Sequence, residues 1–274
     1  MSDNKSDQKP QPYRLEKSPA RNSILVLSGK GGVGKSTVAA NLAISLSLQG
    51  YSTGLLDTDF HGPSIPKLLG MEGIRLVSND GRTLEPAELG GLKVISVDFL
   101  LGNRTDPVIW RGPMKMNVIK QLFEDVNWGE LDFLVVDCPP GTGDEPLSVV
   151  QLIPEPTGAV IVTTPQELSL SDVRRSIQFC HALKLPVLGV IENMSGFVCP
   201  HCGGSTELFG SGGGEEMAGQ MDVPFLGRIP VEPDIVTSGD SGRPFVYHYG
   251  KTSFAKIFEG IVTDLLHSIP GEAE

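Results

Sequence analysis

The chain has 274 residues, only four of them cysteines, and a formal net charge of −11. A domain of this length buries an adequate core without cross-links, so a disulfide-stabilised secreted scaffold is excluded. The negative charge disfavours nucleic acids and anionic membranes as partners, and no apolar run is long enough to cross a bilayer. We therefore expect a soluble, cytoplasmic protein with no nucleic-acid partner and no membrane partner.

The first 22 residues are polar and aperiodic, which predicts a flexible tail (1–22) ahead of one domain over residues 23–270. In that domain, apolar runs without strict alternation predict strands buried on both faces. These strands are expected at 24–27, 54–56, 94–97, 133–136, 159–162, 187–191 and 225–227. Helical spacing of apolar residues occurs at 37–48, 114–126, 169–183 and 254–269. Strands that alternate with helices predict a single α/β domain, a mostly parallel sheet with helices on both faces.

The segment 24–37, ILVLSGKGGVGKST, contains the P-loop pattern G-x-x-x-x-G-K-[ST] between an expected strand and an expected helix. Glycines let the backbone turn its N–H groups inward, and the following helix N-terminus adds to this anion site. Lys35 is expected to contact the β- and γ-phosphates of ATP, Ser36 to ligate Mg²⁺, and Thr37 to donate to the α-phosphate. The predicted nucleotide contacts in this loop are Gly29, Lys30, Gly31, Gly32, Val33, Gly34, Lys35, Ser36 and Thr37.

Polar side chains follow three of the expected strands. Asp57 and Asp59 follow the run 54–56, and Asp137 follows the run 133–136. The carboxyl ends of parallel strands face the ligand crevice, so we expect Asp137 to bind Mg²⁺ as a Walker B carboxylate, with CPPGTGDE (138–145) forming a switch loop. Asn193 follows the run 187–191, and its amide can pair with the donor and acceptor on an adenine edge.

Cys199 and Cys202 form a C-x-x-C pair in the segment FVCPHCGG (197–204), a metal loop with His201 as a possible extra ligand. The spacing alone leaves a redox dithiol, a zinc site and an iron–sulfur site open. Cys180 occupies an apolar position of an expected helix and Cys138 adjoins the Walker B strand, so both are expected to be structural. A four-thiolate site therefore needs two chains, and a two-fold dimer supplies four thiolates.

The loop sequence KGGVGKST resembles the deviant Walker A ATPases, which include MinD/ParA proteins and the nitrogenase iron protein. In that group the first lysine of the pattern crosses a dimer interface, so the resemblance implies that Lys30 acts on the partner's nucleotide. It also implies that Asp59 orients the attacking water and that Asp57 supports the Mg²⁺ shell. Lys30, Lys35 and Asp59 are thus the expected catalytic residues.

Further motifs resemble the Mrp/ApbC/Nbp35 family of ATP-dependent iron–sulfur cluster carriers, in the same order. They are LLDTDFHGPSIPKLLG, VIWRGPMK, VVDCPPGTGDEPLS, IENMSGFVCPHCG and GRIPVEPDI. The resemblance implies a homodimer that hydrolyses ATP slowly, holds a labile [4Fe–4S] cluster between Cys199 and Cys202 of both chains, and passes it to recipient apoproteins. It further implies cluster-assembly scaffolds as partners and places Asn193, Arg228 and Pro230 around the adenine. No N-terminal four-cysteine motif or extra domain precedes the P-loop, so a short form is expected.

Two alternatives remain at this point. A MinD/ParA-like positioning ATPase predicts a basic, membrane- or DNA-binding surface, which the acidic C-terminal stretch and the net charge of −11 disfavour. A zinc-bridged dimeric ATPase stays open, because thiolates bind zinc as readily as iron.

Overall fold

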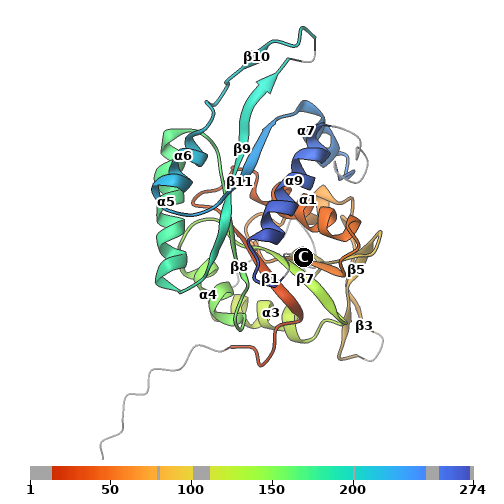
Figure 1. Ribbon diagram of the computed structural model, residues 1–274. Coiled ribbons are helices and arrows are strands. Elements are labelled where there is room, and N and C mark those ends of the chain that lie inside the picture. Colours follow the sequence, from red (N-terminus) through yellow and green to blue (C-terminus); the bar gives the residue numbers. More distant parts are fainter. Residues whose placement is uncertain (1–13, 79–80, 101–111, 200, 245–252, 272–274) are drawn as a thin grey trace, which may run out of the picture.

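The core of the molecule is a mostly parallel sheet (Figure 1). The computed structural model describes residues 14–78, 81–100, 112–199, 201–244 and 253–271. Neighbouring strands follow the order β10-β9-β8-β1-β7-β2-β6-β5, and β11 pairs with β9. The parallel strands are β1 (Ala20–Leu27), β2 (Thr53–Asp57), β6 (Leu92–Ser96), β7 (Leu131–Asp137), β8 (Gly158–Thr163), β9 (Val187–Val198) and β11 (Phe225–Val231).

Shorter strands complete the sheet structure. Antiparallel partners lie at its two ends, where β5 (Ala87–Leu89) pairs with β6 and β10 (Ser205–Thr206) pairs with β9. A separate small sheet joins β3 (Val77–Ser78) to β4 (Leu84–Glu85). The helices are α1 (Lys35–Leu48), α2 (Ile65–Leu68), α3 (Gly112–Glu124), α4 (Asp144–Leu152), α5 (Glu167–Ala182), α6 (Gly213–Gln220), α7 (Pro233–Asp240) and α9 (Ser253–His267).

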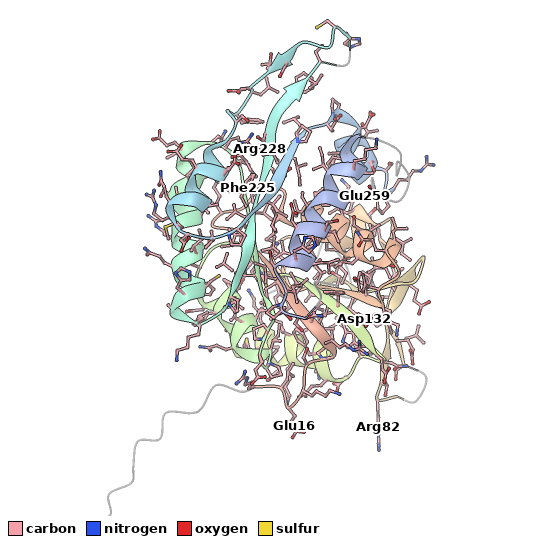
Figure 2. The ribbon with its side chains drawn as sticks, in the orientation of Figure 1. Glu16, Arg82, Asp132, Phe225, Arg228 and Glu259 are labelled. Atoms are coloured by element: carbon pink, nitrogen blue, oxygen red, sulfur yellow. The ribbon has the colours of Figure 1, made fainter. Side chains whose placement is uncertain are left out.

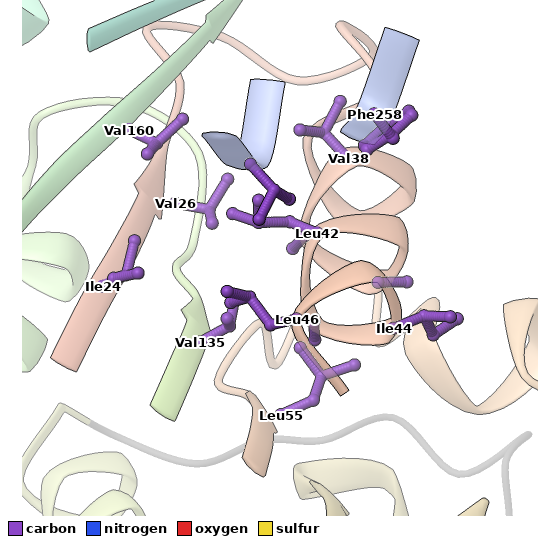
Figure 3. Close-up of a cluster of buried hydrophobic side chains, with 14 of the residues drawn as sticks. Ile24, Val26, Val38, Leu42, Ile44, Leu46, Leu55, Val135, Val160 and Phe258 are labelled. Atoms are coloured by element: carbon purple, nitrogen blue, oxygen red, sulfur yellow. The ribbon is translucent and has the colours of Figure 1, made fainter. Parts of the chain in front are cut away.

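Alternate residues of the central strands feed two separate cores, one on each face of the sheet. In β1, Ile24 and Val26 pack beneath α1 and α9, whereas Leu25 and Leu27 face the side of α3, α4, α5 and α6. Figure 3 shows the first core, where Val38, Leu42 and Leu46 of α1 meet the strands and Phe258 of α9 closes one end. The expected α/β fold with helices on both faces is therefore confirmed.

The N-terminal segment differs from expectation. Residues 1–13 of the expected tail lie outside the described residues, but β1 already begins at Ala20 rather than after residue 22. Leu15 is buried, and its N–H donates to the carbonyl oxygen of Leu152 at 2.9 Å. The boundary at residue 22 is therefore wrong, because one apolar side chain in a polar segment is enough to fix that segment against the core.

Other element boundaries also differ from expectation, including the end of β11 at Val231 rather than residue 227. β6 ends at Ser96, and the expected strand residue Val97 instead starts a 3-10 turn over Val97–Leu100. β9 continues seven residues beyond its expected end and carries the chain out of the sheet to Val198. No described helix is long and apolar enough to cross a membrane.

Candidate functional site

The phosphate loop connects β1 to α1 at the carboxyl end of the sheet. Gly32 and Gly34 have φ values of 81° and 82°, a left-handed conformation that favours glycine. Close approach adds a second reason at Gly34, because a Cβ there would overlap the Nδ2 atom of Asn193. At Gly29 the constraint is packing alone, since a Cβ would collide with Asp172 in α5.

A cavity of about 240 Å³ lies over this loop and brings most of the predicted phosphate residues together, although Gly29 and Val33 are not part of its lining in the described chain. It is lined by Lys30, Gly31, Gly32, Gly34, Lys35, Ser36 and Thr37, together with Asp59 and with Pro140 from the segment after β7. The backbone amides at the start of α1 and the two lysines supply donors and positive charge. This cavity can therefore hold a polyphosphate.

Two buried carboxylates lie side by side beneath the cavity. Asp57 and Asp137 occupy paired positions at the ends of β2 and β7, and neither is exposed. Lys35 Nζ lies 2.5 Å from Asp137 Oδ1, and Asp137 Oδ2 is buried with no hydrogen-bond partner among the described residues. Burial raises the pKa of Asp137, while the Lys35 ammonium opposes that rise. An orphaned carboxylate oxygen beside the phosphate cavity fits the donor set that Mg²⁺ prefers.

Asp57 shapes the turn that follows β2. Its Oδ2 accepts from Ser96 Oγ at 3.0 Å, and its Oδ1 accepts from the backbone N–H of Asp59 at 3.1 Å. Burial raises the pKa of Asp57 well above its usual range, and the neighbouring charge of Asp137 raises it further. Asp59 in turn accepts from the N–H groups of His61 and Gly62, at 3.0 and 3.3 Å. The Asp59 carboxylate is therefore fixed at the cavity wall.

A charged cluster that the motifs did not reveal joins three segments near the same edge. Lys115 Nζ of α3 lies 2.5 Å from Glu145 Oε1 and 2.9 Å from His61 Nε2. The same ammonium lies 5.6 Å from the centroid of the Phe60 ring. Residues 61, 115 and 145 are far apart in the sequence, and each taken alone is an ordinary surface residue type. The cluster connects the segment after β2 with the start of α4.

A second, larger cavity of about 470 Å³ adjoins the phosphate cavity, and the two share Gly34, Thr37 and Ser64. Its lining includes Asn193 and Met194 of β9 and Phe209. The end of β11 contributes Ile229, Pro230 and Val231, and Glu232 follows directly after the strand. Asn193 Nδ2 donates to the carbonyl oxygen of Val33 at 2.8 Å, so the amide links β9 to the phosphate loop. The shape and position suit a nucleoside attached to phosphates in the smaller cavity.

Arg228 forms ion pairs with two acidic residues. Figure 2 shows it on β11 above Phe225, whose ring centroid lies 5.8 Å from the guanidinium carbon. The guanidinium pairs with Glu215 of α6 and lies 3.8 Å from Glu192 of β9. The expected adenine contacts of Asn193, Arg228 and Pro230 stay predictions.

Cys199 and Cys202 lie at the turn between β9 and β10, in a hairpin (residues 197–206, the cysteine hairpin) that projects from the sheet (Figure 1). Two backbone hydrogen bonds of 2.9 Å close the turn, from Cys199 N to Gly204 O and from Gly203 N to Cys199 O. Backbone N–H groups of His201 and Cys202 lower the pKa of the Cys199 thiol. Within the described part of the chain, no group of three or more His, Cys, Asp or Glu residues could hold a metal.

The other two cysteines are buried. Burial raises the pKa of the Cys138 thiol, and it raises that of Cys180 to about 12. Both thiols stay protonated at neutral pH, so their positions agree with the structural role expected for them.

Comparison with known proteins gives relatives over most of the chain. The model of the family described as NUBPL iron-transfer P-loop NTPase, within the ParA group, matches residues 19–266. The chain is 51% identical over 238 residues to a cytosolic Fe-S cluster assembly factor NUBP2 homolog of Dictyostelium discoideum, covering 85% of this chain and 89% of that protein. It is 46% identical over 261 residues to an iron-sulfur cluster carrier protein of Methanocaldococcus jannaschii, covering 95% and 89%.

Solved structures agree with the fold. A nucleotide-binding protein of Archaeoglobus fulgidus, in complex with ADP and with cobalt, has a TM-score of 0.75 at 42% identity and covers 88% of this chain and 93% of that one. The cell division ATPase MinD of Pyrococcus furiosus has a TM-score of 0.66 at 23% identity over 89% and 98% of the two chains, which supports the fold alone.

Proposed function

Because the chain belongs to the NUBPL iron-transfer P-loop NTPase family, we propose that it is an ATP-dependent iron–sulfur cluster carrier. The coincidence of two features supports this proposal most strongly. A phosphate loop with a buried carboxylate pair lies at one end of the sheet. The C-x-x-C pair, with Cys202 exposed and Cys199 half-buried, follows a strand that leaves that same end. Relatives 51% and 46% identical are named as a cluster assembly factor and a cluster carrier.

In the nucleotide reaction, ATP phosphates bind the loop amides and Lys35. Lys35 Nζ then exchanges its 2.5 Å contact with Asp137 for phosphate oxygens. Ser36 and Asp137 would hold Mg²⁺, which would neutralise phosphate charge. Asp57 fixes the turn through its contact with Asp59 N–H. Asp59 orients the water that attacks the γ-phosphorus. The bond from the γ-phosphorus to the β–γ bridging oxygen breaks, ADP leaves with that oxygen and its negative charge, and the proton lost by the water passes through the released phosphate to solvent.

Lys30 lines the phosphate cavity but is not buried as Lys35 is. We assign it to the nucleotide of a second copy, where its charge stabilises the transferring phosphoryl group as an arginine finger does. A single chain therefore hydrolyses ATP slowly, because its catalytic site becomes complete only when Lys30 of a second copy joins it in the homodimer. The same dimer supplies four thiolates, Cys199 and Cys202 from each copy, for one [4Fe–4S] cluster as cargo.

The exposed position of the cysteine hairpin suits a cargo that is passed on. Cys202 is exposed and Cys199 only half-buried, so a recipient apoprotein or an assembly scaffold can reach the cluster ligands. Thiolates are the ligands that iron–sulfur clusters require. The names of the relatives place them in the cytosol, and we assign this protein to the cytoplasm as well.

Anaerobic reconstitution of the full chain with iron and sulfide tests the proposal. We expect about four irons and four sulfides per dimer, a visible charge-transfer absorption, and loss of both in Cys199→Ala. Transfer of the cluster to an apo-ferredoxin, measured by its recovered absorption, tests the carrier role. Stoichiometric zinc with no uptake of iron and sulfide would instead establish a zinc-bridged ATPase.

A further inference from the structure

The larger cavity and the cysteine hairpin share part of their structure. Asn193 and Met194 of β9 line the cavity and lie six and five positions before Cys199, which follows the end of that strand. Phe209 lines the cavity from the segment that returns from β10. The segments just before and just after the cysteine hairpin (residues 192–195 and 207–212, the two roots of the hairpin) thus contribute to one wall of the cavity. The backbone is unusual here, because Met194 has a φ of 58°, in the left-handed region that a methionine rarely adopts.

A buried carboxylate joins the two roots. Glu192 is fully buried and accepts from Ser195 Oγ at 2.5 Å, from the N–H of Gly212 at 2.8 Å, and from the N–H of Gly214. The last two donors belong to the start of α6, directly after the return segment. The bonds to a single carboxylate therefore prevent the roots from separating independently.

The wall is also joined to the phosphate loop. Asn193, the next residue after Glu192, donates to Val33 O at 2.8 Å. The phosphate loop, β9 and the return segment therefore form one hydrogen-bonded unit around the cavity. Phe209 is the aromatic member of this wall on the return segment, and it is 41% exposed.

We propose that Phe209 contacts the nucleoside of the bound nucleotide, and that this contact makes the position of the cysteine hairpin depend on nucleotide occupancy. The inference rests on the proposed function, since it assigns the larger cavity to the nucleoside. A partly exposed aromatic ring beside a cavity gains a second apolar face when a nucleobase or ribose covers it. Phe209 is thus a nucleotide-binding residue and a positioning residue for Cys199 and Cys202.

The test measures nucleotide affinity and hairpin mobility separately, on the full cluster-free chain. ADP and ATP–Mg²⁺ are titrated by calorimetry into wild type and Phe209→Ala. Amide hydrogen exchange of the segment 196–206 is recorded with and without ADP. Leu208→Ala is the matched control, because Leu208 is the adjacent exposed apolar residue, at 55%, and the cavity lining does not include it in the described chain.

We expect Phe209→Ala to weaken ADP binding about ten-fold and to abolish the slowing of exchange that ADP causes in the hairpin. Phe209→Trp should restore both, and Leu208→Ala should change neither. The inference is overturned if Phe209→Ala binds ADP with wild-type affinity and shows the wild-type slowing of amide exchange in the hairpin. It is also overturned if saturating ADP slows exchange equally in Phe209→Ala and wild type. If the alanine variant does not fold, Phe209→Leu, which keeps apolar volume without an aromatic face, carries the same comparison.

The cluster assay separates this inference from the proposed function. Wild type that takes up no cluster contradicts the carrier proposal whatever the nucleotide data show. Wild type that holds a cluster and binds ADP, with Phe209→Ala identical to it in affinity and hairpin exchange, overturns only the role of Phe209.

Discussion

The two ends of β9 lie in opposite environments. Val190, Ile191 and Glu192 are fully buried, with β8 paired on one side and β11 on the other. At the far end, Val198 is 58% exposed and pairs with the two-residue strand β10. One strand therefore begins in the rigid core beside the nucleotide cavities and ends in a projecting turn that holds the two accessible cysteines (Figure 1).

This contrast separates two requirements on one chain. Phosphoryl transfer needs donors and carboxylates fixed by packing, and buried Asp57 and Asp137 on paired strands provide that. A transferable metal cluster needs ligands that another protein can approach, and the hairpin provides that. If the two ends of β9 are separable in this way, substitutions in the cysteine hairpin should leave ATP hydrolysis intact, and substitutions in the nucleotide site should leave cluster binding intact. Substitutions between the two ends should change only how nucleotide binding affects the hairpin.

The largest expected effect is at the hairpin. Cys199→Ala and Cys202→Ala should each lose the reconstituted cluster, because two of its four thiolates in the dimer disappear. Their ATP hydrolysis and thermal denaturation midpoint should stay within error of wild type, since the turn contacts neither core. Iron and sulfide content, ATPase rate and circular dichroism measure the three properties. Loss of ATPase activity in these variants would show that the two ends are not separable in this way.

Lys35→Ala should lower the ATPase rate about 100- to 1000-fold, because one preorganised charge at the transferring phosphate is removed. Cluster content after reconstitution should not change. Phosphate release and iron content measure the two effects.

Lys30→Ala serves as the matched variant. It should lower the ATPase rate, and activity should return when this variant is mixed with a Lys35→Ala chain, because that chain still supplies Lys30 to its partner. No rescue in the mixed dimer would count against action across the interface.

Much of the nucleotide end could be predicted from the sequence, because its determinants are local. The P-loop pattern lies between a strand and a helix, and Asp57 and Asp137 directly follow apolar runs whose parallel pairing brings their ends together. The helix layers on both faces of a mostly parallel sheet follow from the alternation of strands and helices. These features depend on periodicity and on residues within one βα unit.

The features that were missed depend on contacts between distant segments. His61, Lys115 and Glu145 meet only because the segment after β2, α3 and α4 converge. The ion pairs of Arg228 with Glu192 of β9 and Glu215 of α6 likewise join separate segments. The role of Glu192 depends on the N–H groups that its carboxylate reaches across 20 and 22 positions of chain.

A smaller effect is expected from the buried cysteines. Cys180→Ala removes a buried side chain of α5 that lies in the same core as Val173 and Ile177, so it should lower the free energy of unfolding by about 1 kcal/mol. Cys138→Ala, in the same core, is the matched variant and should behave alike. Urea denaturation measures the loss, and reconstitution should give wild-type cluster content for both. A reduced cluster content would assign one of these thiols to cluster transfer.

The smallest effect concerns the cluster of His61, Lys115 and Glu145. Partial burial alone raises the pKa of Glu145, but hydrogen bonds and charge from Lys115 and His61 outweigh it and lower that pKa below its usual value of 4.5. Ionised Glu145 therefore stabilises the fold above about pH 4.5, and this contribution is lost as the pH falls through the lowered value. Glu145→Gln should lower the free energy of unfolding by about 0.2–1 kcal/mol at pH 7, with no difference from wild type in strong acid.

Urea denaturation at several pH values measures this dependence. In a Lys115→Met background the same Glu145→Gln substitution should have a smaller acid-dependent effect, because Lys115, the larger of the two influences that lower the Glu145 pKa, is gone and only His61 remains. Glu145 lies in the first turn of α4. Its pair with Lys115 connects that helix to α3, and its contact with His61 connects it to the segment after β2. A difference between Glu145→Gln and wild type that persists unchanged at pH 3 would mean that charge is not what this residue contributes.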